Sequence, residues 1–275
     1  MWHPVPQAAL PHPSTGIGTN GPWNRLVQID QPQPPRRSRI VPVIFGRLAL
    51  SILLGLGIVA GLIWGEVIAI PNRHNPFTPL RIADDISWLT RLKLSRLERG
   101  GEQCRSVLAD SFVSHRSVPD RPLERGCGLS DAVEVSRSLV GLNREFTATC
   151  SLAVAWALFE AHVLRPAARQ HFGQDVVRVT HFGTYACRNV NHRAIGRRSE
   201  HATANAIDIA DFVLADGQQI TVKSDWTGSN PRRSAFLRTL RNGACDFFDV
   251  VLSPDYNEAH HDHFHFDMGS YRACR

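Results

Sequence analysis

The stretch HHDHFHFD, residues 260–267, places four histidines within six positions near the end of the chain. Neutral histidine is the commonest side-chain metal ligand in proteins. A second segment, SEHATANAIDIADF, offers His201 and, seven residues later, Asp208. A carboxylate in so apolar a run needs a partner, which is either a cation or a structural salt bridge. Together the two segments predict a metal site.

Both segments alternate in the way that β-strands do. In AIDI, residues 206–209, the isoleucines fall on one face and Asp208 falls on the other. In HFHF, residues 263–266, His263 and His265 share one face, and the phenylalanines can pack into the core. The metal-binding side chains are therefore expected on the faces opposite the core.

We expect His201, Asp208 and one histidine of the HxH pair to bind Zn²⁺. A water in the fourth position would complete the open tetrahedral arrangement of a catalytic zinc site. Two neutral imidazoles and one carboxylate leave the site with net positive charge, which preserves its power to polarise a carbonyl and to acidify water. His171, His181 and His192 have no such partners and are interpreted as ordinary polar residues.

A hydrolytic zinc site also needs a proton acceptor and contacts to the substrate. His263 or His260 could take the proton from water and return it to the leaving group, and both stay candidates. Arg188, in YACRN, is a candidate clamp because a guanidinium can hold a carboxylate through two hydrogen bonds. The alternative for Arg188 is a surface position or a structural ion pair.

The elements that must position these residues follow from periodicity and turn signals. The run at 150–173 predicts a buried helix that ends or kinks near Pro166, and DDISWLTRLKLSRLERGG predicts an earlier helix. Strands are expected within 176–185, 205–226 (a hairpin), 247–254 and 263–269. We therefore expect an α+β fold in which N-terminal helices pack on a small antiparallel sheet that carries the zinc site.

An apolar run precedes this domain. Residues 48–65 carry no charge, and the run extends to about residue 70, which is long enough to cross a hydrocarbon core of ~30 Å as a helix. Four arginines lie on its N-terminal side, which places the proline-rich, disordered arm at 1–47 in the cytoplasm. A cleavable signal peptide and a buried core helix are the alternatives. Residues 71–103 are interpreted as a linker and helix, and residues 104–275 as the folded domain.

All six cysteines follow the apolar run, as expected for disulfides in an oxidising compartment. Six cysteines allow fifteen connectivities; we expect Cys104 to pair with Cys127. The net charge of +6 is diffuse, and no nucleic-acid-binding motif is present, so nucleic acid is not expected as a partner. The sequence thus indicates a single-pass protein of the inner membrane whose folded domain faces the periplasm.

SEHATANAID resembles the S-x-H-x-x-G-x-A-x-D segment of the zinc peptidases grouped with lysostaphin, the D-Ala-D-Ala metallopeptidases and the hedgehog proteins, with Ala204 in place of glycine. HDHFHFD resembles their HxH motif. With YACRN, VLSPDYNEAHHDHFHFD and the cysteines, residues 104–275 are similar to the bacterial extensin-like C-terminal domain family. The resemblance implies that His201, Asp208 and His265 bind zinc and that His263 lies beside the metal. It also implies that His260 lines the site.

These observations predict a membrane-anchored zinc metallopeptidase that hydrolyses peptide bonds in the stem peptides of peptidoglycan, as a cross-link endopeptidase or a D,D-carboxypeptidase. One alternative is a non-catalytic domain that retains the zinc site and binds or organises the cell wall. Another is a periplasmic metal-binding or sensing protein. Oligomeric state and the bond that is cut do not follow from the sequence.

Overall fold

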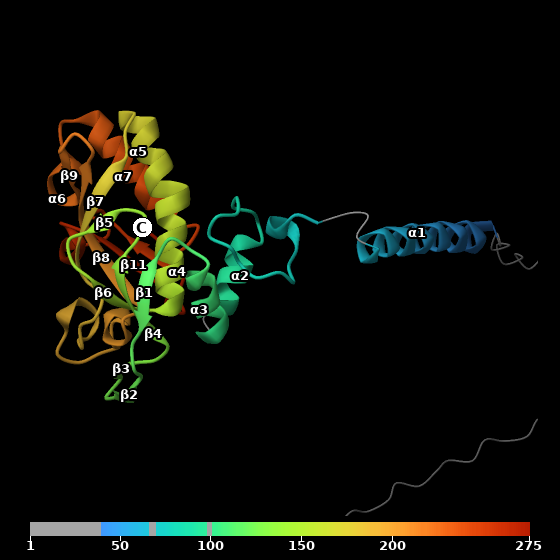
Figure 1. Ribbon diagram of the computed structural model, residues 1–275, viewed down its shortest axis with the longest axis horizontal. Helices are drawn as coiled ribbons and strands as arrows, with labels where there is room; N and C mark the ends of the chain where they lie inside the picture. The colour runs from blue at the N-terminus through green and yellow to red at the C-terminus, as the bar shows by residue number, and fades with distance from the viewer. Residues whose placement is uncertain (1–39, 66–69, 98–100) are drawn as a thin grey trace, which may run out of the picture. The chain divides into compact units, whose positions relative to one another are not determined.

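The computed structural model describes residues 40–65, 70–97 and 101–275. The chain divides into two compact units, residues 1–64 and 65–275, and both are drawn in Figure 1. Each unit is described separately below.

Helix α1, Ile40–Trp64, is the described part of the first unit. Its stretch Phe45–Trp64 has a mean hydropathy of 2.1, and none of it is buried. Among the described residues it is the one helix long and apolar enough to cross a membrane. The helix begins before residue 48, so residues 40–47 are helical instead of belonging to the expected disordered arm. The rest of that arm, and residues 66–69 of the expected span, lie outside the described residues.

The second unit begins with a segment that packs onto its core. Residues 72–74 form a short 3-10 turn, and Thr90–Leu97 forms helix α2. The apolar side chains of Leu80, Ile82 and Leu94 are buried in the main core. The ammonium group of Lys93 donates to the carbonyl oxygen of Asn72 at 2.7 Å, which fastens the turn to the helix. The segment expected as a linker and helix is thus folded against the domain over its described residues.

A small sheet follows, which the sequence did not predict. After helix α3, Gly101–Ala109, strands β1 (Ser114–Ser117), β4 (Ala132–Arg137) and β6 (Phe146–Thr149) pair antiparallel in the order β1-β4-β6. Between them, β2 (Arg121–Glu124) and β3 (Cys127–Leu129) form a separate hairpin.

The buried helix predicted at 150–173 is present and does not break at Pro166. Helix α4, Cys150–Phe159, continues through a π-helical turn at Glu160–Leu164 into α5, Arg165–Phe172. Proline lacks an amide hydrogen, so the wider turn just before it accommodates the lost hydrogen bond. In Figure 1 this continuous helix runs beside the large sheet, where Phe159 contacts Phe266 at a ring-centroid distance of 5.5 Å.

The large sheet has seven strands, in the order β12-β10-β11-β8-β7-β5 with β9 paired to β8. Its strands are β5 (Gly141–Leu142), β7 (Val176–Gly183), β8 (Ala206–Leu214), β9 (Gln219–Thr221), β10 (Val250–Leu252), β11 (Phe264–Asp267) and β12 (Ala273–Cys274). The pairs β5–β7 and β10–β12 are parallel. Helix and sheet are mixed as expected, but the expectation of a small antiparallel sheet is wrong. The two-residue strands that add the parallel pairs are too short to leave a periodic signal.

Two further helices lie between β9 and β10. Helix α6 is Val222–Asp225, and α7 is Pro231–Ala244. The side chain of Asn230 accepts hydrogen bonds from two backbone amides of the first turn of α7, and Pro231 follows it, which is a favourable helix start. The buried side of α7 presents Phe236, Leu237 and Leu240 to the core.

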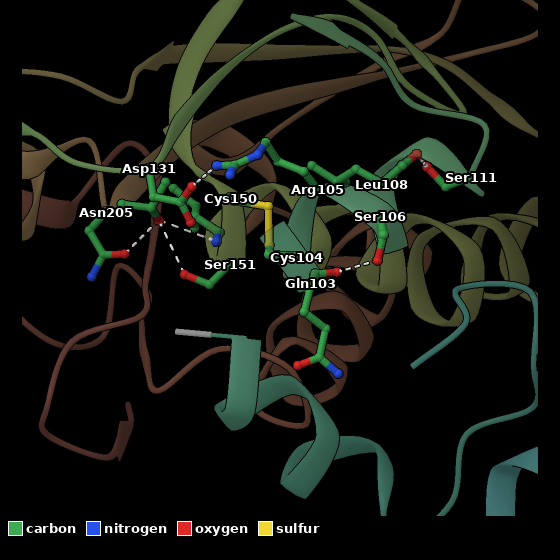
Figure 2. The surroundings of a disulfide bond; sticks show 12 residues. Gln103, Cys104, Arg105, Ser106, Leu108, Ser111, Asp131, Cys150, Ser151 and Asn205 are labelled. Carbon is green, nitrogen blue, oxygen red and sulfur yellow. Dashed lines mark hydrogen bonds and ion pairs between the residues drawn. A yellow bond between two sulfur atoms is a disulfide. The ribbon is translucent and has the colours of Figure 1, made fainter. Parts of the chain in front are cut away.

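The disulfides differ from the expected pairing of Cys104 with Cys127. The bonds are Cys104–Cys150, Cys127–Cys187 and Cys245–Cys274. Figure 2 shows the first of them joining α3 to the start of α4, close to the ion pair of Arg105 with Asp131. Helix packing, which sequence spacing does not reveal, brings Cys104 within 6.0 Å of Cys150, measured between Cα atoms.

Candidate metal centre

The pairing of β11 with β8 places the two sequence motifs side by side. In this antiparallel pair Asp208 lies directly opposite His265, and Ile207 lies opposite Phe266. The apolar faces of both strands are turned to the core, so the polar faces meet on the other side of the sheet. His201 approaches from a short 3-10 helix, Glu200–Thr203, that precedes β8.

Three buried groups converge there. One ligand atom from each of His201, Asp208 and His265 can be chosen so that all lie within 4.8 Å of one another. The distance from His201 Nε2 to His265 Nδ1 is 3.2 Å. Asp208 lies 3.1 Å from His201 Nε2 through Oδ2 and 2.9 Å from His265 Nδ1 through Oδ1. Ligand atoms at 2.0–2.1 Å from a tetrahedral zinc ion are separated by about 3.3 Å, so the three groups fit such an ion.

The remaining ring nitrogens are held by acceptors. Nδ1 of His201 lies 3.0 Å from the carbonyl oxygen of Thr184, and Nε2 of His265 lies 2.9 Å from Oδ2 of Asp267. A ring nitrogen that donates to such an acceptor leaves the other nitrogen with a free lone pair. This arrangement fixes the tautomer of metal-binding histidines. The centre is thus rich in acceptors and attracts a positive species.

The acid–base behaviour has the same origin. Burial alone would lower the pKa of His265, but hydrogen bonds to Asp208 and Asp267 outweigh it and raise the pKa to about 9. Burial alone would raise the pKa of Asp208, but hydrogen bonds to His201 and His265 hold it well below its usual value. Surroundings that favour a proton on His265 also favour a divalent cation that displaces it.

Two further histidines lie beside this trio. Nε2 of His263 is 3.5 Å from Oδ1 of Asp208, and its Nδ1 is 2.8 Å from Oδ1 of Asp262. The ring of His260 lies 5.6 Å from that of His265, and its Nδ1 is 2.7 Å from Oδ1 of Asn257. Burial, followed by the nearby charges of His265 and His263, lowers the pKa of His260 to about 4, so His260 is neutral near pH 7.

Two members of the trio, Asp208 and His265, line a cleft composed of two hollows. One hollow has a volume of about 350 Å³ and is lined by His265, Asp267 and Tyr256, among others. The other has a volume of about 360 Å³ and is lined by Asp208, His263 and Phe182, among others. Both hollows are lined by Arg188, Asn191 and His260. The cleft therefore reaches His265 through one hollow and Asp208 through the other.

Arg188 lies where the two hollows meet, on the loop between β7 and β8. Its positive charge contributes to the lowered pKa of His260. The sequence analysis interpreted His192 as an ordinary polar residue and assigned no role to Asn191 or Asp267. All three line the cleft. Asp267 could have been found, because it continues the period of two from His263 and His265. The loop residues 191 and 192 offer no such pattern.

Ala204 stands where the motif that this segment resembles has glycine. Its φ is 55°, in the left-handed region, and its side chain is fully buried. Glycine adopts this conformation at no steric cost, whereas an L-residue is strained there. Hydrogen bonds from the amides of Ala204 and Asn205 to the carbonyls of His201 and Glu200 close the turn. The turn sets the approach of His201 to strand β8.

The comparisons with known proteins give one match. The sequence model of the family described as "Extensin-like protein C-terminus" matches residues 102–275, which is more than half of the chain. Neither the curated proteins nor the solved structures contain a match.

Proposed function

Since the chain belongs to the family of extensin-like protein C-termini, we propose that its second unit is a zinc-dependent peptidase that hydrolyses peptide bonds in peptidoglycan. The observation that carries this proposal is the buried trio His201–Asp208–His265, of which His265 lines one hollow of the cleft and Asp208 lines the other.

Zinc would be held by Nε2 of His201, the carboxylate of Asp208 and Nδ1 of His265. When bound, a zinc ion supplies the Lewis acidity that polarises a scissile carbonyl and makes water acidic near neutral pH. Three protein ligands leave a position open to substrate, as in catalytic zinc sites, whereas structural sites are usually closed by a fourth protein ligand. Asp267 and the carbonyl of Thr184 keep both imidazoles oriented.

His263 is the better placed general base. Its Nδ1 is held by the carboxylate of Asp262, while its Nε2 points to the metal ligand Asp208. Burial raises the pKa of Asp262, but the hydrogen bond with His263 and the nearby positive charges together outweigh it and hold the pKa below its ordinary value. A carboxylate on one ring nitrogen orients the imidazole and stabilises its charged form. His263 would take a proton from the attacking water at Nε2 and return it to the leaving amine.

His260 and Arg188 act on the substrate. His260 is held by the amide oxygen of Asn257 and has a lowered pKa, so it would remain neutral and contribute hydrogen bonds. The guanidinium of Arg188 would bind a carboxylate of a stem peptide. Because His265 lines one hollow and Asp208 lines the other, an extended peptide that passes the metal ligands could occupy both. This geometry favours cleavage within a cross-link over removal of a terminal residue.

The rest of the chain supports a location at the inner membrane. Helix α1 is long and apolar enough to span the bilayer, and three disulfides tie the second unit together. Disulfides persist in oxidising compartments. We propose that α1 is an uncleaved anchor, that the N-terminal arm is cytoplasmic and that the second unit lies in the periplasm.

The test is digestion of purified, cross-linked peptidoglycan by the full chain in detergent, followed by mass analysis of the fragments. Samples would contain zinc, a chelator, or the Asp208→Ala variant. We expect cross-linked dimers to disappear with zinc only, and the fragment masses to identify the bond. His263→Ala should lose turnover while it keeps zinc.

The matched control is His74→Ala, because His74 is exposed and lines neither hollow of the cleft. It should cleave like the wild-type chain. A folded chain that binds one zinc ion and yields no fragments would contradict the proposal. Co-sedimentation of that inactive chain with peptidoglycan would then favour a cell-wall-binding domain, and rapid release of zinc would favour a metal-binding or sensing protein.

A further inference from the structure

The segment that follows the apolar helix carries an unusual concentration of exposed apolar side chains. Phe77 is 93% exposed, Trp88 is 78% exposed, and Ile86 and Leu92 are about half exposed. We call these four residues the α2 face. Exposed apolar residues that occur singly need no explanation, whereas a cluster of them marks a surface that contacts something apolar.

The members of the α2 face gather around the start of α2. Trp88 lies in the turn that leads into the helix, two residues before Thr90, and Leu92 lies in the first turn of the helix. One turn further on, the guanidinium of Arg96 donates to the carbonyl oxygen of Pro76 at 2.5 Å. This bond brings the backbone next to Phe77 close to α2.

Folding of the domain does not account for the α2 face. The other side of α2 already packs onto the core through Leu94 and Leu97, which are almost fully buried. Among the described residues, Trp88 and Phe77 therefore have no apolar partner in this chain that would cover them. A Trp side chain left in water at this position indicates an external apolar phase.

The short connection between α1 and this segment indicates which apolar phase contacts the α2 face. Trp64 ends α1, and Pro71 lies seven positions further along the chain, which limits their distance to about 25 Å. Tryptophan and other aromatic side chains favour the membrane–water interface. The basic side chains of Arg81 and Arg96 in this segment are exposed and can approach anionic headgroups. We propose that the α2 face docks into the interface of the bilayer that α1 spans.

Docking would leave the cleft accessible. In Figure 1 the gold loop 188–199, which lines both hollows, and helix α2 lie on opposite sides of the second unit. With α2 against the lipid, the cleft opens away from the bilayer. The segment 71–97 would then fix the orientation of the domain relative to the bilayer, whereas a long flexible linker would leave that orientation free. This inference rests on the proposed role of α1 as an anchor.

The experiment uses tryptophan fluorescence of the full chain in bilayers of phosphatidylethanolamine and phosphatidylglycerol. Bromine atoms placed on the acyl chains near the headgroups quench only those indoles that reach the interface. The emission of Trp88 is obtained as the difference between the wild-type chain and Trp88→Phe, and that of Trp64 from Trp64→Phe. We expect Trp88 to be quenched to an extent similar to Trp64.

Two variants sharpen the result. The double variant Phe77→Ser/Leu92→Ser removes two apolar side chains from the α2 face. It should reduce the quenching of Trp88 and leave the quenching of Trp64 unchanged. Ile195→Trp, in the Trp88→Phe background, places an indole at a position that is 90% exposed on the 188–199 loop, and it should not be quenched.

Quenched Trp64 with unquenched Trp88 would overturn the docking proposal and leave the anchor intact, as expected if a second copy or another protein covers the α2 face. Unquenched Trp64 would overturn the anchor and, with it, the docking. Quenching of Trp88 that persists in the double serine variant, or quenching of the indole at position 195 to the same extent, would also overturn the docking.

Discussion

Substitution of Glu160 should change how the stability of the second unit depends on pH. Glu160 lies in the π-helical turn and is fully buried. Its carboxyl accepts hydrogen bonds from the hydroxyl of Ser138 at 2.6 Å and from the amide of Leu139 at 3.2 Å. Burial nevertheless dominates over these hydrogen bonds and raises the pKa of Glu160 from 4.5 to about 8.

Between pH 4.5 and about 8, the folded protein keeps the proton on Glu160, whereas the unfolded chain releases it. The free energy of unfolding therefore falls as the pH rises through this window, by about 1.4 kcal/mol per pH unit and about 5 kcal/mol in all. Glutamine has nearly the same shape and no charge, so Glu160→Gln should abolish this loss. The difference in unfolding free energy between the variant and the wild type should therefore shift in favour of the variant by about 5 kcal/mol between pH 4.5 and pH 8.5.

The assay is equilibrium unfolding of residues 65–275 in urea, with the disulfides intact, at a series of pH values. The control is Glu145→Gln, which removes an exposed carboxylate that water solvates in both states, so the wild-type pH profile should be retained. If the difference in unfolding free energy between Glu160→Gln and the wild type is constant across the window, Glu160 is not protonated in the fold and the reasoning is refuted.

Three other substitutions test the site and the packing. Asp267→Asn removes the charge that lies 2.9 Å from His265 Nε2. The affinity for zinc, measured in competition with a chelator, should therefore fall about 10–100-fold. An unchanged affinity would show that Asp267 does not support His265 as a ligand. Arg188→Ala should raise KM for peptidoglycan fragments by about 10–100-fold, because a charged hydrogen-bonded pair with the substrate is lost. The value of kcat should change little. A fall in kcat with KM unchanged would exclude a role of Arg188 in holding the substrate carboxylate. A Cβ atom at Gly243 would meet Val163 Cγ1 at 2.5 Å, so Gly243→Ala should cost about 1–3 kcal/mol, measured by urea unfolding. Val163→Ala in the same chain should recover part of that cost, and strict additivity of the two changes would contradict the contact.

Local alternation was sufficient to predict which side chains face the cleft. The pleat of a strand fixes the faces of Asp208 and His265 wherever the strands lie, and both strands form as predicted. That the two residues lie directly opposite each other is a matter of register. The requirement that Ile207 and Phe266 both point to the core permits this register without selecting it.

The rest of the architecture depends on contacts that leave little local trace. The strands at Gly141–Leu142 and Ala273–Cys274 have two residues each, so their parallel pairing was not predictable. The first sheet alternates between polar and apolar residues only over short stretches. The disulfides follow tertiary packing, so the nearest cysteine in sequence was a poor guide for Cys104.

The Cys127–Cys187 bond has a consequence for where the protein can act. Cys187 immediately precedes Arg188, so the bond fastens one wall of the cleft to strand β3. In the reducing cytoplasm that covalent fastening does not form. If the second unit acts in the periplasm, as we propose, this wall of the cleft is completed only after export, and we expect the chain to be inactive until it is oxidised. Oxidation would then serve as the activating signal.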